Sequence, residues 1–87
     1  MQAVIMDKRE FLKNGEYAKE EYEGIIVSSD TKHGYYNIAI ELDNNRVVIV
    51  DNVKDNEVHQ RLHQWVPKVL EVQKQFGVHN QADNYYH

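Results

Sequence analysis

Residues 22–53 hold the pattern that most constrains the fold of this chain. Three runs rich in β-branched and aromatic residues, at 23–29, 35–42 and 46–53, are separated by residues typical of turns. Connections this short join antiparallel neighbours, because a parallel crossover needs about a dozen residues or more. The sequence therefore predicts a three-stranded antiparallel β-meander, in which the register of the first hairpin stays open.

The alternation of apolar and polar side chains favours one register for the second hairpin. Asn44 and Asn45 predict a two-residue turn with positive φ at both positions, which asparagine tolerates better than other non-glycine residues. This turn places Leu42 opposite Val47. One face then carries Tyr36, Ile38, Ile40, Leu42, Val47, Ile49 and Val53, interrupted by Asp51. The opposite face carries Tyr35, Ala39, Val48 and Val50 among polar residues.

From residue 54 onwards the apolar residues recur with a helical period. Six of them follow at spacings of 4, 3, 4, 3 and 4, which predicts an amphipathic helix across one face of the sheet: Val58, Leu62, Trp65, Val69, Val72 and Phe76. Pro67 interrupts the hydrogen bonding of this helix. Because the apolar spacing keeps its phase across Pro67, one kinked helix is favoured, and the alternative is a break near Trp65 with Pro67 opening a second helix.

The N-terminal segment predicts a short strand followed by a short helix. Residues 2–6 are mostly apolar, and Asp7 and Glu10 have the spacing of a capping box for a helix over residues 8–14. Met6 and Phe11 are placed to form a hydrophobic staple. The predicted fold class is α+β, with one domain over residues 1–77 and a polar C-terminal tail over 78–87.

Charge and composition narrow the classes of partner. Fourteen acidic residues against ten basic ones give a formal net charge of −4, whereas nucleic-acid binders carry a basic face. Without cysteine, disulfides and thiolate chemistry are excluded, and no apolar run approaches the ~18 residues of a membrane span. We therefore expect a cytoplasmic chain with no direct nucleic-acid contact and no membrane. Many of its residues have AT-rich codons, which hints at a phage or mobile element.

His59 and His63 form the one pattern with metal-ligand spacing. Two histidines at i and i+4 lie on the same helix face and can share a metal ion. The sequence has no glutamate in the position of a metalloprotease base. The alternative to metal binding is that both rings pack at the border of the core. No cofactor and no catalytic group is predicted.

These features favour a non-catalytic module that binds a partner protein, as a regulator or inhibitor does. Surplus apolar side chains on the second sheet face, Val66 and Leu70 beside the helix stripe, and an acidic segment supply the expected surface. The predicted partner-binding residues are Glu16, Tyr17, Glu20, Glu21, Tyr22, Glu23, Tyr35, Val48 and Val50. The competing expectation is that the N-terminal strand and helix cover the second sheet face within the chain.

Two other functions stay open. The first is a structural protein that forms a homodimer or larger assembly, with the six apolar helix residues 58, 62, 65, 69, 72 and 76 as its seam. The second is a small metal-binding protein that uses His59 and His63.

Overall fold

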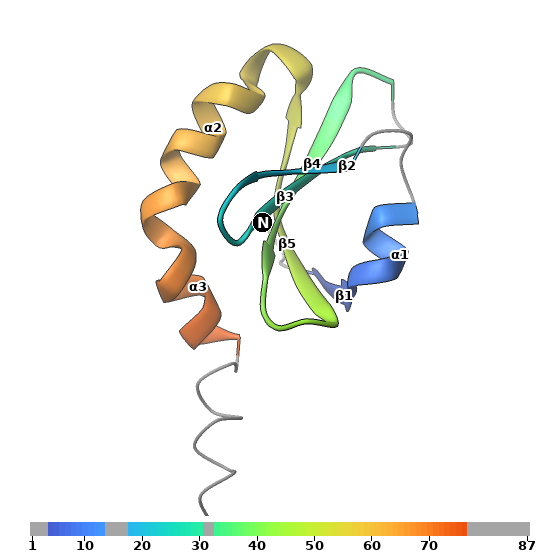
Figure 1. Cartoon of the computed structure of the whole chain (residues 1–87). Coiled ribbons are helices and arrows are strands. Elements are labelled where there is room, and N and C mark those ends of the chain that lie inside the picture. The colour runs from blue at the N-terminus through green and yellow to red at the C-terminus, as the bar shows by residue number, and fades with distance from the viewer. Residues whose placement is uncertain (1–3, 14–17, 31–32, 77–87) are drawn as a thin grey trace, which may run out of the picture.

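The computed structural model describes residues 4–13, 18–30 and 33–76, with the backbone alone for residues 18–21. Five antiparallel strands form one sheet in the order β1-β5-β4-β3-β2 (Figure 1). The strands are β1 (Val4–Asp7), β2 (Ala18–Tyr22), β3 (Ile25–Ser29), β4 (Tyr35–Glu41) and β5 (Arg46–Lys54). The helices are α1 (Lys8–Lys13), α2 (Val58–Trp65) and α3 (Val69–Gln75), with 3₁₀ turns η1 (Asp55–Glu57) and η2 (Val66–Lys68).

The predicted α+β class is confirmed, since the chain forms an antiparallel sheet followed by a C-terminal helix. The three predicted strands correspond to β3, β4 and β5. Residues 18–22, which carry neither a clear strand period nor a helical one, add β2 through a tight turn at Glu23 and Gly24. The N-terminal strand adds β1 at the other edge, beside β5.

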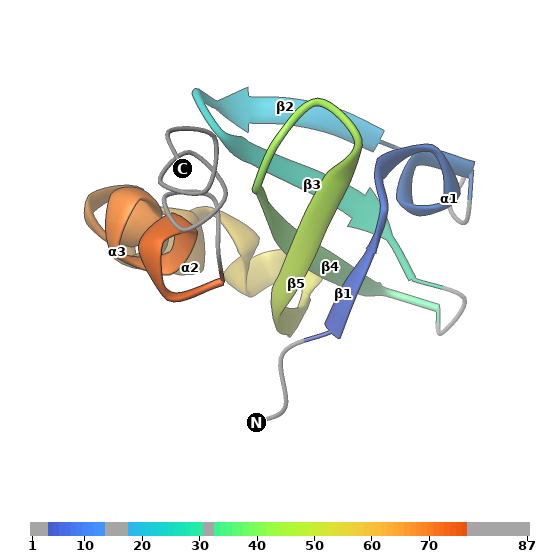
Figure 2. The ribbon, with the colours of Figure 1, turned by 90° about the horizontal axis from the view of Figure 1, so that it is seen from below.

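The sheet is covered on its two faces by segments from opposite ends of the chain (Figures 1 and 2). The C-terminal helix, by which we mean residues 58–75 from α2 through α3, covers one face, and α1 covers part of the other. The larger core lies under the C-terminal helix and contains Ile25, Val27, Ile38, Ile40, Leu42, Val48, Val50, Val53, Leu62 and Val72. The smaller core lies under α1 and contains Phe11, Ile26, Ala39 and Val47, with Met6 and Ile49 packed against it.

A β-bulge divides the β4–β5 hairpin into two registers. Tyr36 lies opposite Val53, as the sequence predicts, but beyond Ile38 the pairing shifts by one residue, so that Ile40 lies opposite Val48. The bulge adds one residue to β5, so the side chains of β5 that precede it point to the face opposite to the predicted one. The predicted faces are therefore correct for β4 and wrong for residues 47–50.

The turn of this hairpin also differs from the predicted one. No described non-glycine residue has positive φ, so Asn44 and Asn45 do not form the two-residue turn that the sequence suggests. Instead, Asp43 Oδ1 accepts hydrogen bonds from the backbone N–H groups of Asn45 and Arg46, both at 2.8 Å. An Asx turn of this kind closes a longer loop without positive φ.

The start of α1 follows the predicted capping pattern. The backbone N–H groups of Arg9 and Glu10 donate to Asp7 Oδ1 at 2.8 and 3.4 Å. Phe11 is buried and Met6 packs against the same cluster. The predicted end of this helix, at residue 14, lies outside the described residues.

The C-terminal helix is interrupted at Pro67. After α2 ends at Trp65, the 3₁₀ turn η2 contains Pro67, and α3 continues from Val69. This corresponds to the alternative in which the helix breaks near Trp65, and Pro67 fits there because its missing N–H lies at the start of a new turn. The apolar side chains keep their phase across the break, and all six pack on the same core.

A polar cluster fixes α2 on the sheet. The buried carboxylate of Asp51, on β5, accepts hydrogen bonds from Arg61 Nη1 at 3.0 and 3.1 Å and from Trp65 Nε1 at 3.0 Å. At the other end of the helix, Gln73 Nε2 donates to the backbone oxygen of Glu41 at 2.8 Å. Because both α2 and α3 are tied to the sheet, the residues on their outer side have fixed positions.

Candidate interaction surface on the C-terminal helix

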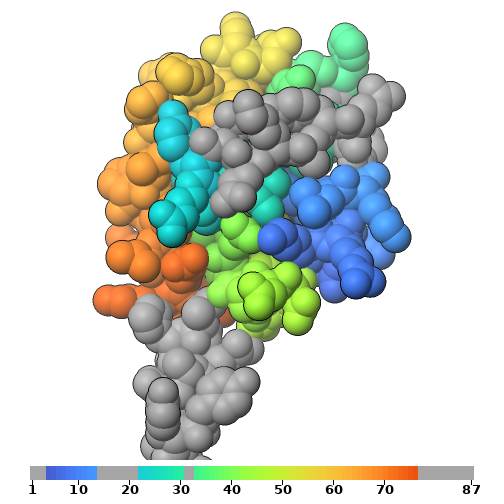
Figure 3. Space-filling view, in the orientation of Figure 1, coloured from blue at the N-terminus to red at the C-terminus, as the bar shows by residue number. Residues whose placement is uncertain are grey.

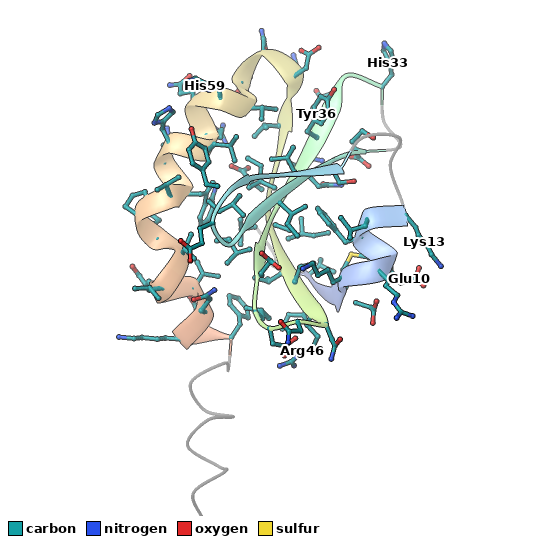
Figure 4. All side chains as sticks on the ribbon, in the orientation of Figure 1. Glu10, Lys13, His33, Tyr36, Arg46 and His59 are labelled. Carbon is teal, nitrogen blue, oxygen red and sulfur yellow. The ribbon has the colours of Figure 1, made fainter. Side chains whose placement is uncertain are left out.

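The C-terminal helix carries a second stripe on its solvent side. His59, His63, Val66 and Leu70 follow at spacings of 4, 3 and 4, and we call them the outer stripe. All four are exposed, with 41% of the surface of Val66 and 67% of that of Leu70 accessible to solvent. Figure 4 shows His59 on the side of α2 that points away from the sheet.

A hollow lies beside the apolar end of the outer stripe. It is lined by Glu23 and Gly24 from the β2–β3 turn and by Val69, Leu70 and Gln73 from α3. Figure 3 shows this turn, in cyan, directly against the orange surface of the helix. The hollow therefore combines two segments that are far apart in the sequence.

Gly24 allows this close approach of turn and helix. Its φ of +83° is a conformation that residues with a side chain rarely adopt, and a Cβ atom there would lie 3.1 Å from Val69 Cγ1. Glycine thus serves both the backbone of the turn and its packing against α3.

The two histidines of the outer stripe contact each other. Their ring centres lie 4.7 Å apart, with an angle of 75° between the ring planes. Tyr22, at the end of β2, presents its ring to His63 at 6.2 Å between centres. Both side chains are exposed, and His63 borders the larger core through Tyr22, which packs against it.

The structure separates the predicted partner-binding residues. Val48 and Val50 are 0% and 5% exposed beneath the C-terminal helix, so the expectation that they lie on an open face is wrong. The bulge in β5 is the physical reason, because it turns both side chains towards the helix. Tyr22 and Tyr35 are half-buried and Glu23 is exposed. Glu16 and Tyr17 lie outside the described residues, as do the side chains of Glu20 and Glu21.

The six residues predicted as an oligomer seam are used within the chain. Leu62 and Val72 are buried, and the other four (Val58, Trp65, Val69 and Phe76) are partly buried against the larger core. The larger part of this stripe therefore covers the sheet of its own chain and leaves little surface for a second copy. The seam of a homo-oligomer would have to lie elsewhere.

Acidic side chains near the second hairpin are paired with cations. Glu41 accepts a hydrogen bond from Lys8, and Asp43 forms an ion pair with Arg46 at 2.9 Å. Partial desolvation acts to raise the pKa of Asp43, but hydrogen bonds from the amides of Asn45 and Arg46 and from the Arg46 guanidinium outweigh it and hold this pKa below its ordinary value of 3.8.

Metal-ligating side chains do not gather in larger groups. Among residues 4–13, 18–30 and 33–76, three or more histidine or acidic side chains nowhere come together as a set of metal ligands. His59 and His63 are therefore a pair without a third protein ligand in this part of the chain.

Three apolar side chains outside the C-terminal helix are also exposed. Val4 and Ile5 on β1 and Leu12 on α1 are 51%, 45% and 40% exposed. The predicted surplus apolar surface includes Val66 and Leu70 but not these three residues. For Val4 and Ile5 the available signal is the apolar run at residues 2–6, which predicts a strand.

Two findings complete the description of the surface. In the described ranges, every helix is too short or too polar to cross a membrane. Comparisons of the chain with protein-family models, with curated proteins and with solved structures give no match.

Proposed function

We propose that this chain is a small module that binds a partner protein through the apolar end of the outer stripe, formed by Val66 and Leu70. The observation that carries the proposal is the exposure of Leu70, of which 67% is accessible on a helix that is otherwise firmly packed. Burying a leucine side chain fully contributes about 1.5–3 kcal/mol. Leu70 therefore offers a partner apolar surface whose burial favours binding.

The surroundings of Leu70 support this role. The hollow between α3 and the β2–β3 turn lies next to it and is bordered by the polar residues Glu23 and Gln73. Exposed Glu71 and Lys74 flank it on the helix. An apolar anchor within a polar rim is the usual organisation of a protein–protein interface.

Of the predicted acidic segment, residues 16–23, the described residue Glu23 lies at the same hollow. Glu23 is exposed and lines it, and the chain leads back from Glu23 through Glu21 and Glu20 to Tyr17 and Glu16. We include this segment in the proposed surface as a preference for basic groups on the partner. The role of a regulator or inhibitor carried by a phage or mobile element stays a prediction from composition.

A homodimer is the competing proposal, and the packing of the inner helix residues weakens it. A homodimer would use the same exposed side chains, Val66 and Leu70, because the six inner residues of the C-terminal helix pack against the sheet of their own chain. Light scattering over a wide concentration range separates the two proposals, since a stable dimer that Leu70→Asp dissociates would favour self-association.

Site-specific photocrosslinking tests the proposed surface. A photoreactive residue at position 70 should capture one defined protein from an extract, while the same residue at Asn44, which is exposed in the β4–β5 turn and lines a hollow beside α1, should not. The captured protein, once purified, should bind the wild-type chain directly. Leu70→Asp should abolish this binding, and Asn44→Asp should leave it intact. Equal binding by both variants would refute the assignment of the surface.

A further inference from the structure

We propose that His59 and His63 form a chelating site for a divalent transition-metal ion, with water in the remaining coordination positions. The inference is independent of the protein-binding surface, because it rests on the other half of the outer stripe. Imidazole nitrogen suits Zn²⁺, Cu²⁺ and Ni²⁺, whereas Mg²⁺ and Ca²⁺ prefer oxygen ligands.

The distance between the two rings fits shared coordination. A metal–nitrogen bond of about 2.0–2.1 Å places the centre of a ligating imidazole roughly 3.2 Å from the ion, so the centres of two neighbouring ligands lie about 4.5–5.2 Å apart. The observed separation of the ring centres of His59 and His63 is 4.7 Å. The two rings are thus already at the separation that shared coordination needs, and binding requires them to turn so that one nitrogen of each is directed at the ion.

The backbone that carries the pair is already in place. Between the two histidines, Arg61 extends to the opposite side of the helix and pairs with Asp51, and Leu62 is buried in the larger core. These contacts hold the helical turn that brings positions 59 and 63 together. Binding a metal ion therefore requires no ordering of the chain, which keeps its entropic cost low.

The site is open on its outer side. Both imidazoles are exposed, and among the described residues Tyr22 contacts the ring of His63. A two-histidine site of this kind exchanges its water ligands freely, in contrast to a closed structural zinc site with four protein ligands. The structure thus assigns to this face of α2 a labile metal site that can accept further ligands from outside.

The test uses Ni²⁺ as the probe and a variant with unchanged composition. Exchanging His63 with the exposed Gln64 next to it, as His63→Gln together with Gln64→His, keeps every histidine but moves the second one to another side of the helix. Calorimetry should show one Ni²⁺ ion bound by the wild-type chain. The exchange should lower this affinity on the order of 100-fold, since joining two weak sites gives a gain of that size.

A second measurement and a control separate this site from other histidines. Ni²⁺ should raise the melting temperature of the wild-type chain and not that of the exchange variant, because only the folded helix holds both ligands together. His33→Ala removes an exposed histidine elsewhere and should bind Ni²⁺ as the wild type does. Equal Ni²⁺ affinity of the wild-type chain and the exchange variant, or no binding at millimolar Ni²⁺, would overturn the proposal.

Discussion

The carboxylate of Asp51 accepts the indole N–H of Trp65 at 3.0 Å, across the boundary between β5 and α2. The side chain of Asp51 is 7% exposed and also pairs with Arg61, which is 39% exposed and reaches Glu57 at 3.7 Å. A carboxylate is tolerated in a core only when hydrogen bonds satisfy its oxygen atoms. Asp51 accepts such bonds from the backbone N–H of Asn52, the guanidinium of Arg61 and the indole N–H of Trp65. Asp51, the polar residue on the apolar face of the second hairpin, thus attaches α2 to the sheet.

Asp51→Ala should destabilise the fold substantially. The substitution leaves the indole N–H of Trp65 without its acceptor in a half-buried position, while Arg61 can still reach Glu57 and water. We expect a loss of about 2–3 kcal/mol in the free energy of unfolding, measured by urea denaturation. Asp43→Ala, which removes a carboxylate of a more exposed pair, should cost less, about 1 kcal/mol. Similar losses for both variants would show that the burial of Asp51 does not increase its contribution to the free energy of unfolding.

The two glycines with positive φ allow backbone strain to be separated from packing. Gly24 and Gly34 have nearly equal φ values of +83° and +81°, but a Cβ atom would meet Val69 only at Gly24. Gly34→Ala should therefore cost about 1 kcal/mol for the backbone alone. Gly24→Ala should cost more, because Val69 must also move. Equal melting temperatures of the two variants would mean that the β2–β3 turn does not press on α3.

Truncation of two leucines on the C-terminal helix should change the stability of the fold by very different amounts. Leu62 is 3% exposed in the larger core, so Leu62→Ala should lower the free energy of unfolding by about 2–5 kcal/mol. Leu70→Ala removes a side chain that is mostly in solvent and should change it by less than about 0.5 kcal/mol. Chemical denaturation of both variants checks this. A large loss for Leu70→Ala at concentrations where the chain is monomeric would contradict the exposed position of that residue.

The Asp43 turn should weaken on acidification. The pKa of Asp43 is lower in the folded chain than its ordinary value, so the carboxylate form is stabilised by folding. This stability is fully present above the unfolded-state pKa of about 3.9 and is lost as the pH falls through the lower folded-state pKa. Thermal unfolding measured from pH 6 down to about pH 2 should show a smaller decline for Asp43→Asn, whose amide oxygen keeps the turn but does not titrate. Parallel curves for both proteins would contradict the role of the carboxylate.

Local signals in the sequence predicted the local structure well. The cap at Asp7 and the positions of β3, β4 and β5 depend on neighbouring residues, and the structure confirms them. The strand β2 was not predicted, because its lysine and glutamates are poor strand formers and only its pairing with β3 makes it a strand. Gly24 was the available signal, since a glycine before an apolar run is typical of a tight turn.

The candidate surface was only partly predictable. Exposure of Val66 and Leu70 follows from helical geometry, and it is confirmed. The positions of Val48 and Val50 depend on one extra residue inside β5, and alternation of side chains cannot reveal such a bulge when every residue from 47 to 50 is apolar. The contact of Asp51 with Trp65 joins a strand to a helix, which spacing along the chain does not show.

The order of strands also determines when the fold can be completed during synthesis. β1 is the first strand of the described chain, yet its partner β5 is the last, and Val4 pairs with Ile49. A ribosome must therefore release more than half of the polypeptide before the apolar N-terminal strand finds its neighbour. Until then Val4 and Ile5 are accessible to chaperones or to other nascent chains, and the hairpins from β2 to β5 are the part of the molecule able to assemble ahead of them.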